Sequence, residues 1–283
     1  MTAQLMPFKS HRPAVRHVML GIFTFAMCLF IVAPLAVVVV NSFNEVAYNV
    51  FPPSGFSTKW YVNLLAQDVF YSAAVRSILL ATLSTAVALV IGTMSAYALV
   101  RYRLPASDFV KAFLLSPIVL PKIVLGVALF MFFVRIRMLD NYSSLLITHI
   151  LVILPFVIAL VSAALANFDW TLQEAAMDLG AGPIRTFIRV VLPQISVSVG
   201  IAGIFAFVTS FDQVETTIFM VKTGSNTLPV EMFNYLQKWQ DPTIAALSTL
   251  LILFAAALVA LISPMLRHRN NPFDIQTAGR HTP

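Results

Sequence analysis

Residues 145–166 read LLITHILVILPFVIALVSAALA, a run of 22 residues without Asp, Glu, Lys or Arg. An α-helix needs about 20 consecutive apolar residues to cross the roughly 30 Å hydrocarbon core of a bilayer. A strand of a membrane β-barrel would have about 10 residues of alternating polarity instead. This stretch therefore predicts a membrane-spanning helix and an all-α membrane protein.

Five further stretches extend the prediction to six transmembrane helices. They are Val18–Val40, Ser77–Val100, Ala112–Val134 with Lys122 as its single charge, Thr243–Met265, and a shorter run, Ile195–Phe211, that continues through Asp212 and Glu215 to Val221. The whole chain of 283 residues is 59% hydrophobic and 11% charged, whereas soluble domains are about 45–50% apolar and 25% charged. Its single cysteine, Cys28, excludes a disulfide framework and a cysteine metal cluster.

The distribution of Lys and Arg assigns an orientation. An even number of spans puts both termini on one side, and that side carries eleven Lys and Arg against six on the other. By the positive-inside rule both termini are expected to be cytoplasmic. The net charge of +6 is then a topology signal, and nucleic-acid binding has no support.

These assignments divide the chain into segments. We expect a cytoplasmic N-terminal segment at 1–17, a first helix at 18–41, a five-helix core at 72–265 and a cytoplasmic tail at 266–283. The first apolar run is about twice as long as the 7–15 residues of a signal peptide, so an uncleaved helix is expected.

The cytoplasmic connection at 167–194 reads NFDWTLQEAAMDLGAGPIRTFIRVVLPQ, and its first half predicts a short helix. Thr171 and Glu174 have the spacing of an N-terminal capping box. Gly180 supplies the left-handed position at which such a helix stops.

The second half of this loop predicts another short helix. Pro183 suits its first position, and Pro193 is expected to end it. One apolar stripe at helical spacing is formed by Ile184, Phe187, Ile188 and Val191. On local chemistry alone, the loop fits an interfacial hairpin that merely connects two spans as well as it fits a functional element.

Residues 174–193 read EAAMDLGAGPIRTFIRVVLP, and this stretch resembles the EAA loop of binding-protein-dependent ABC importers, whose pattern is EAA-x3-G-x9-I-x-L-P. The one departure is Val190 in place of Ile. From Phe56 through Ile262 the chain resembles the second permease subunit of polyamine-type importers. We call residues 167–194 the EAA loop.

The resemblance implies a type I importer permease with six transmembrane helices in a bacterial inner membrane. It also implies a second, different permease subunit, two ATPase subunits that bind ATP and Mg²⁺, and an extracytoplasmic solute-binding protein. The chain lacks a G-x-x-x-x-G-K-[ST] phosphate loop, so no cofactor is expected in it and hydrolysis would fall to the partner ATPases.

The resemblance further implies that the EAA loop docks into a groove on an ATPase subunit. Glu174 matches the motif glutamate that pairs with a basic residue there, and Ala175 and Ala176 match the small positions that allow close docking. The full set of expected coupling residues is Glu174, Ala175, Ala176, Asp178, Gly180, Ala181, Gly182 and Pro183.

Charges inside spans mark a candidate substrate pathway, because intramembrane charges usually face a cavity or a partner charge. Lys122 follows Pro121, where the helix should be broken, and Asp212 and Glu215 are three residues apart, on one helix face. The expected pathway residues are Lys122, Phe211, Asp212, Gln213 and Glu215. A structural ion pair for Lys122, and simple exposure at the outer mouth for the two acids, are the alternatives.

The substrate class stays open at this point. The resemblance implies a polyamine-like solute, but polyamine-type permeases often carry acids where Lys122 and Gln213 stand here. A zwitterion or anion, such as an opine, another amino-acid derivative or an aminophosphonate, fits as well.

Two other classes compete with a transporter. An intramembrane enzyme would need partners for His149, and no H-E-x-x-H or G-x-S-x-G motif accompanies it. His149 therefore fits a helix–helix hydrogen bond better than catalysis, and no catalytic or metal-binding residue is predicted. An ion channel lacks a filter-like motif and leaves the EAA loop unexplained.

Overall fold

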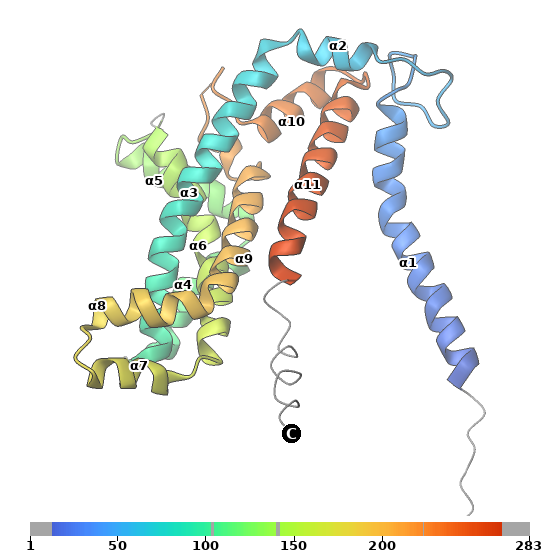
Figure 1. Ribbon diagram of the computed structural model, residues 1–283. Helices are drawn as coiled ribbons and strands as arrows, with labels where there is room; N and C mark the ends of the chain where they lie inside the picture. Colours follow the sequence, from blue (N-terminus) through green and yellow to red (C-terminus); the bar gives the residue numbers. More distant parts are fainter. Residues whose placement is uncertain (1–12, 103–104, 140–141, 223, 268–283) are drawn as a thin grey trace, which may run out of the picture. The chain divides into compact units, whose positions relative to one another are not determined.

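The structure of the chain is a computed structural model that describes residues 13–102, 105–139, 142–222 and 224–267. The helices are α1 (Pro13–Asn41), α2 (Lys59–Leu65), α3 (Asp68–Arg101), α4 (Ser107–Val119), α5 (Lys122–Arg135), α6 (Tyr142–Ala166), α7 (Trp170–Asp178), α8 (Pro183–Thr186), α9 (Leu192–Phe211), α10 (Leu228–Lys238) and α11 (Thr243–Arg267) (Figure 1). A π-helical turn, η1 (Phe187–Val191), and a 3₁₀ turn, η2 (Thr217–Phe219), complete the set. The described residues contain no strand, so the predicted all-α class is confirmed. Most of the expected N-terminal segment and of the expected tail lies outside these residues.

Four helical segments are long and apolar enough to cross a membrane. They are His17–Asn41, Asp68–Arg101, Tyr142–Ala166 and Pro183–Phe211. The pair α4 and α5 counts as a fifth span only if the two bent helices are taken together. In α11 the apolar part searched, Thr243–Ala257, is shorter. The structure thus supports a multi-pass protein, while the count of six spans stays a prediction.

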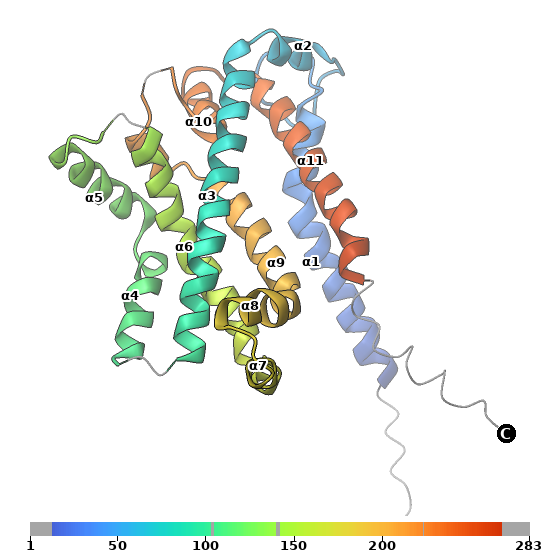
Figure 2. The same ribbon diagram turned by 60° about the vertical axis from the view of Figure 1, so that its left-hand side comes forward.

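The pair α4 and α5 departs from the single helix expected at Ala112–Val134. The two helices meet at an angle of 104° (Figure 2). Leu120 has extended backbone angles, with φ −76° and ψ 137°, because the ring of a following proline excludes the helical conformation. Pro121 precedes Lys122, the first residue of α5. The sequence predicts a local break in one helix here, whereas in the structure the helix axis changes direction completely.

The described chain divides into two compact units, of which unit 1 takes in residues 13–66 and 239–265. In this unit the Trp60 indole donates to the Asn44 carbonyl at 2.7 Å, and the Asn63 amide donates to the Thr243 hydroxyl at 2.9 Å. Trp60 is buried. These bonds fix α2 and the loop before it, so Trp60 serves the packing of unit 1.

Unit 2 takes in the described residues of Gln67–Lys238, and its centre is the packing of α3, α6 and α9 against one another. The buried side of α3 carries small residues at four-residue spacing, including Ala88, Gly92 and Ala96. A Cβ atom at Gly92 would lie 2.6 Å from the Val157 Cγ1 atom. Small residues let membrane helices approach closely without a hydrophobic driving force, which explains why this stripe forms the core.

The fifth predicted span begins as expected and ends earlier. Helical hydrogen bonding continues from Pro183 to Phe211, but the chain changes direction at the π-helical turn, so that α8 runs across α9 (Figures 1 and 2), and α9 begins at Leu192 with Pro193 in its first turn. In the π-helical turn the Leu192 amide bonds to the Phe187 carbonyl, a wider register that accommodates the missing N–H of Pro193. At the other end α9 stops at Phe211, so Asp212 and Glu215 lie in a turn and not on a helix face.

Candidate functional site

The first helix of the EAA loop, α7, has the predicted end but a different start. Asp169 is its N-cap, and its carboxylate accepts from the Thr171 amide at 3.1 Å and from the Thr171 hydroxyl at 2.7 Å. The predicted capping box of Thr171 and Glu174 is therefore wrong, because Thr171 already lies inside the helix. Gly180 has φ +87°, and the Ala181 amide bonds back to the Ala176 carbonyl at 3.1 Å. This is the glycine-dependent stop that the sequence predicts.

The second helix begins as predicted, with Gly182 as its N-cap and Pro183 in its first turn. The predicted apolar stripe divides into two parts. Val191 is fully buried and Phe187 is half-buried, whereas Ile184 and Ile188 are exposed. The wider π-helical register rotates the stripe, so only Phe187 and Val191 face the core.

The EAA loop is attached to the end of α3 by a hydrogen bond from a buried side chain. The Gln173 amide nitrogen donates to the Tyr97 hydroxyl at 2.7 Å, and Gln173 is only 2% exposed. The Tyr97 ring also lies edge-on to Phe187 at 4.9 Å. Tyr97 therefore contacts both halves of the loop, α7 and η1.

A second attachment joins Glu174 to α3. The Arg101 guanidinium and the Glu174 carboxylate form an ion pair at 3.1 Å, and the guanidinium lies over the Trp170 ring at 5.2 Å. The glutamate side chain is 56% exposed. The motif glutamate is thus held in place from one side while the other side stays open.

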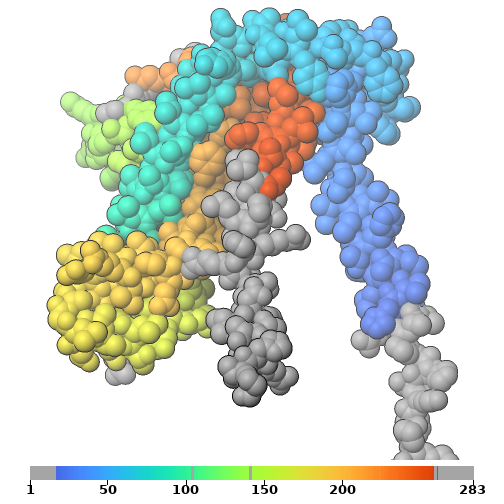
Figure 3. Space-filling view, in the orientation of Figure 1, coloured from blue at the N-terminus to red at the C-terminus, as the bar shows by residue number. Residues whose placement is uncertain are grey.

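The remaining expected coupling residues lie at the surface of the loop (Figure 3). Ala176 and Ala181 are half-buried, and the exposed ones are Ala175, Asp178, Gly180, Gly182 and Pro183. Leu179, between the two helices, is 89% exposed. The structure brings all these residues together on one knob of unit 2.

A second cluster surrounds the end of α9. A Cβ atom at Gly126 of α5 would lie 2.9 Å from the Thr216 Cα atom and 3.0 Å from the Glu215 carbonyl oxygen. Glycine at 126 thus lets α5 lie directly against the turn after α9. This contact carries Lys122, at the start of α5, toward the two acids.

The charges of this second cluster interact. Asp212 follows the last residue of α9, and partial burial raises the pKa of its carboxyl above the ordinary value. The Glu215 carboxylate raises this pKa further, and the Lys122 ammonium lowers it. Lys122, Asp212 and Glu215 are all exposed in the isolated chain.

The two other expected pathway residues have different environments. Gln213 is 1% exposed, its amide nitrogen donates to the Thr216 hydroxyl at 3.0 Å, and its amide oxygen has no partner among the described residues. Phe211 is half-buried, and its ring stacks on that of Phe207 at 6.1 Å. Gln213 thus holds the turn, while Phe211 belongs to the helix end.

A buried polar network supports this turn from inside the bundle. His149 Nδ1 lies 2.8 Å from the Ser210 Oγ atom, and His149 Nε2 lies 3.0 Å from the Thr217 Oγ1 atom. Ser84 of α3 joins through a 2.9 Å contact to Ser210. His149 therefore links α6 to α9 and η2, which confirms the predicted helix–helix hydrogen bond. The described residues contain no group of three His, Cys, Asp or Glu that could hold a metal ion.

Sequence reasoning missed the residues that fix both clusters. Arg101 and Tyr97 lie more than 70 positions before the loop residues they contact, and Ser210 and Thr217 are ordinary hydroxyl residues of an apolar stretch. Of these residues, only Arg101 could have been found from the sequence, because a basic residue at the end of an apolar helix can be expected to have an acidic partner.

The chain is similar to permease proteins of polyamine importers. The spermidine/putrescine transport system permease protein PotC of Escherichia coli (strain K12) is 31% identical over 239 residues, which cover 84% of this chain and 90% of PotC. PotC of Haemophilus influenzae is 30% identical, with 88% and 96% covered. The putrescine transport system permease protein PotI of Escherichia coli (strain K12) is 31% identical, with 89% and 92% covered. No protein-family model matches the chain.

Among solved structures, a chain from a bacterial ABC transporter involved in the import of the acidic polysaccharide alginate has a TM-score of 0.70. The match covers 94% of this chain and 100% of that chain at 14% sequence identity. At this identity the likeness concerns the fold.

Proposed function

The chain belongs to the permease subunits of ABC importers, the family of PotC and PotI, and on this basis we propose how it couples and what it carries. As a family member it is a multi-pass inner-membrane transport component and not itself an enzyme. In the proposal it forms half of a translocation pathway together with a second permease subunit. Two ATPase subunits drive it, a solute-binding protein delivers the solute, and both termini are cytoplasmic.

The attachment of the EAA loop to α3 carries the proposal of coupling. Docking at the exposed Glu174, Ala175 and Gly180 moves the loop, and the bonds to Tyr97 and Arg101 pass that movement to α3. Two independent contacts, a part-buried hydrogen bond and an ion pair at the surface, make the loop and the helix end a rigid unit, as rigid-body switching between states requires.

The backbone of Gly180 provides the test of coupling. Gly180→Val places a branched side chain at φ +87°, which costs about 1–2 kcal/mol of backbone strain, although no atom lies within 4 Å of the new Cβ. We expect the variant to insert into the membrane but to lose ATPase copurification or uptake. Gly180→Asn is the matched control, because asparagine tolerates the left-handed conformation, and it should retain both.

Wild-type ATPase copurification and wild-type uptake in Gly180→Val would contradict the assignment of this loop to coupling. Equal loss in both variants would assign the defect to the side chain and not to the backbone of Gly180.

For the substrate, we propose a small organic amine that also carries an acidic group. Asp212 and Glu215 offer two carboxylates to an amine, and Lys122 beside them offers an ammonium to a carboxylate or phosphonate. A polyamine carries only positive charges and would meet Lys122 as a like charge. The relation to PotC and PotI supports an amino group in the substrate, and the presence of Lys122 supports an acidic group in the same substrate.

Uptake by the Lys122→Met variant tests the substrate. If Lys122 contacts the substrate, the variant assembles normally, keeps basal ATPase activity and loses uptake of a labelled zwitterion such as an opine. If Lys122 is instead a structural partner of an acid, the variant loses assembly, because an acid is left unpaired. Normal zwitterion uptake by a well-assembled variant, or uptake of putrescine alone by the wild type, would refute the zwitterion proposal.

A further inference from the structure

The turn between α9 and η2 carries two of the expected pathway acids on a short segment. Asp212 and Glu215 are exposed, and the Glu215 carboxylate accepts from the Gln213 amide at 3.4 Å. The segment runs from Ser210, in the last turn of α9, to Thr217, the first residue of η2. The positions of the two carboxylates therefore depend on how the two ends of this segment are fixed.

A single side chain, that of His149 in α6, holds both ends. Its Nδ1 atom lies 2.8 Å from the Ser210 Oγ atom, and its Nε2 atom lies 3.0 Å from the Thr217 Oγ1 atom. An imidazole with one N–H offers one donor and one acceptor, and a hydroxyl can serve as either, so both bonds form together. Because the ring is rigid, it sets the separation of the two ends. We call His149, Ser210 and Thr217 the His149 clamp.

The His149 clamp is buried. His149, Ser210 and Thr217 are 1%, 2% and 0% exposed. The fully buried Ser84 of α3 adds a contact of 2.9 Å to the Ser210 hydroxyl. Hydrogen bonds are stronger in such surroundings than in water, and a polar group left unpaired there is costly. The two bonds of the imidazole therefore resist opening.

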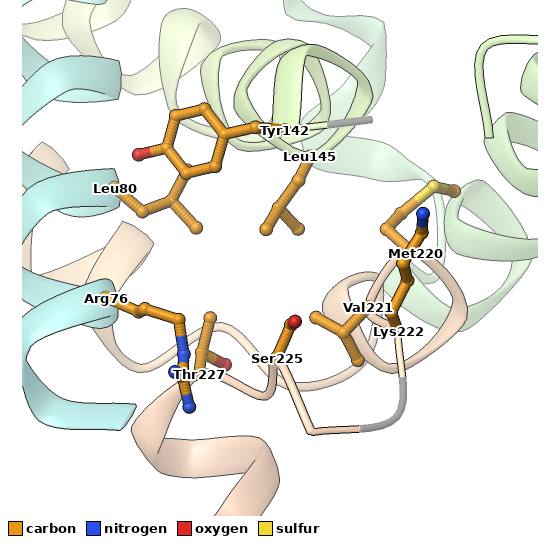
Figure 4. A pocket seen from close by; sticks show the side chains of 9 residues that line it. All are labelled: Arg76, Leu80, Tyr142, Leu145, Met220, Val221, Lys222, Ser225 and Thr227. Carbon is orange, nitrogen blue, oxygen red and sulfur yellow. The ribbon is translucent and has the colours of Figure 1, made fainter. Parts of the chain in front are cut away.

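The far side of η2 is anchored independently. Met220, directly after η2, is 3% exposed and packs with Leu80 of α3 and Leu145 of α6 in one apolar cluster. Figure 4 shows these three side chains around a cavity of about 230 Å³. The Met220 amide also bonds to the Thr217 carbonyl at 2.8 Å. Thr217 is thus held through its backbone as well as through its side chain.

The outer side of the turn meets α5. A Cβ atom at Gly126 would lie 2.9 Å from the Thr216 Cα atom and 3.0 Å from the Glu215 carbonyl oxygen, and α5 begins with Lys122. The turn is therefore enclosed between the His149 clamp on one side and α5 on the other. A change in the clamp changes where the acids of the turn lie relative to Lys122.

We infer that His149 is a positioning residue for substrate binding. It holds the two ends of the turn, so that the two carboxylates between them meet the amino group of the substrate in one fixed arrangement. The inference rests on the proposed pathway role of Asp212 and Glu215. It adds a residue that acts through the turn and not by contact with the substrate.

Substitutions at the two ends of the turn test the His149 clamp. Thr217→Val removes one hydroxyl and leaves a ring nitrogen unpaired, whereas Thr217→Ser keeps the hydroxyl and is the conservative rescue. Ser210→Ala opens the other end, and it decides the question if Thr217→Val does not assemble. Thr148→Val is the matched control. Thr148 is next to His149 and fully buried, but its hydroxyl bonds to the Ser144 carbonyl within α6 at 2.8 Å.

Uptake kinetics in proteoliposomes measure the effect on the substrate, with ¹⁴C-octopine and ¹⁴C-putrescine as probes. Both probes carry amino groups. We expect Thr217→Val and Ser210→Ala to raise the KM of the transported probe about fivefold to tenfold at unchanged kcat, because substrate binding is weakened and the transport step is not. Thr217→Ser and Thr148→Val should keep the wild-type KM, which a general loss of stability would not predict.

A second measurement needs no substrate. A nitroxide spin label is attached to a cysteine at the exposed position Asp212, in a cysteine-free background of the assembled importer in nanodiscs. The central line of its electron paramagnetic resonance spectrum should be narrower in Thr217→Val and Ser210→Ala than in the wild type, because the turn moves more freely. Thr217→Ser and Thr148→Val should keep the wild-type line.

The two measurements separate the possible failures. Wild-type mobility of the label in both clamp variants would overturn the His149 clamp, whichever substrate is carried. Increased mobility with a wild-type KM would overturn the role in substrate binding, and so would an equal rise of KM in Thr148→Val. Uptake of putrescine alone by the wild type refutes the proposed zwitterion, and the clamp variants then test the inference through the KM of putrescine.

Discussion

Replacing Tyr97 by Phe isolates the hydrogen bond that attaches the EAA loop to α3. The ring keeps its contact with Phe187, so only the hydroxyl is lost. The Gln173 amide nitrogen then has no acceptor but the Met177 sulfur at 3.9 Å, and its amide oxygen is already unpaired among the described residues. Leaving a buried polar group unpaired costs about 1–3 kcal/mol, and we expect that loss of stability in Tyr97→Phe.

A double-mutant cycle with Gln173→Leu tests this explanation. When the amide is absent, removal of the hydroxyl leaves nothing unpaired at that position. The double variant should therefore be about as stable as Gln173→Leu alone, with an interaction free energy of about 1–3 kcal/mol. Thermal unfolding of the purified importer in detergent gives the stabilities. Transport per ATP hydrolysed in proteoliposomes gives the coupling, which should fall in Tyr97→Phe as the loop loosens.

Additive effects of the two substitutions would refute the reasoning, because the cost of Tyr97→Phe would then come from something other than Gln173. Unchanged transport per ATP in a measurably destabilised Tyr97→Phe variant would separate the bond from coupling and leave it a packing feature.

Two further predictions follow from the backbone and the topology. Gly126→Ala should cost about 1–3 kcal/mol by overpacking, because the new Cβ meets backbone atoms at 2.9–3.0 Å. Gly200→Ala, with no atom within 4 Å, should cost nothing in the same thermal unfolding assay, and equal effects would contradict the close contact. In a cysteine-free background, cysteines at the exposed positions Asn49 and Ser225 should react with an impermeant maleimide from outside the cell, and one at Leu179 only after permeabilisation. Outside labelling at Leu179 would reverse the orientation.

The parts of this molecule that follow from local chemistry could be predicted from the sequence. The stop at Gly180 and the start at Pro183 depend only on backbone conformations that these residues favour. The start of α7 was misplaced because Asp169 and Thr171 are both good caps, two positions apart, and Asp169 bonds to Thr171 itself. Which of the two residues caps α7 depends on the path of the chain before the helix, and the local sequence does not determine that path.

The parts that depend on contacts distant in sequence could not be predicted. The ion pair of Arg101 with Glu174 joins residues 73 positions apart, and no periodicity predicts such a pairing. Asp212 was expected on a helix face because the apolar run continues beyond it, but α9 ends at Phe211 and the turn after it packs against Gly126, a contact distant in sequence. The sequence does single out the charged residues of this cluster, since charges in apolar runs are rare.

The straight part of this span, α9, has a mechanical consequence. Its 20 residues make a rod of about 30 Å at 1.5 Å per residue, with one end at the bend that leads out of the EAA loop and the other at the turn that holds Asp212. A tilt of about 10° around its midpoint moves the two ends by about 3 Å in opposite directions for a rod of this length. A push on the EAA loop therefore reaches the charged turn through the bend between α8 and α9 (Figure 1), and the stiffness of that bend sets how much of the movement arrives.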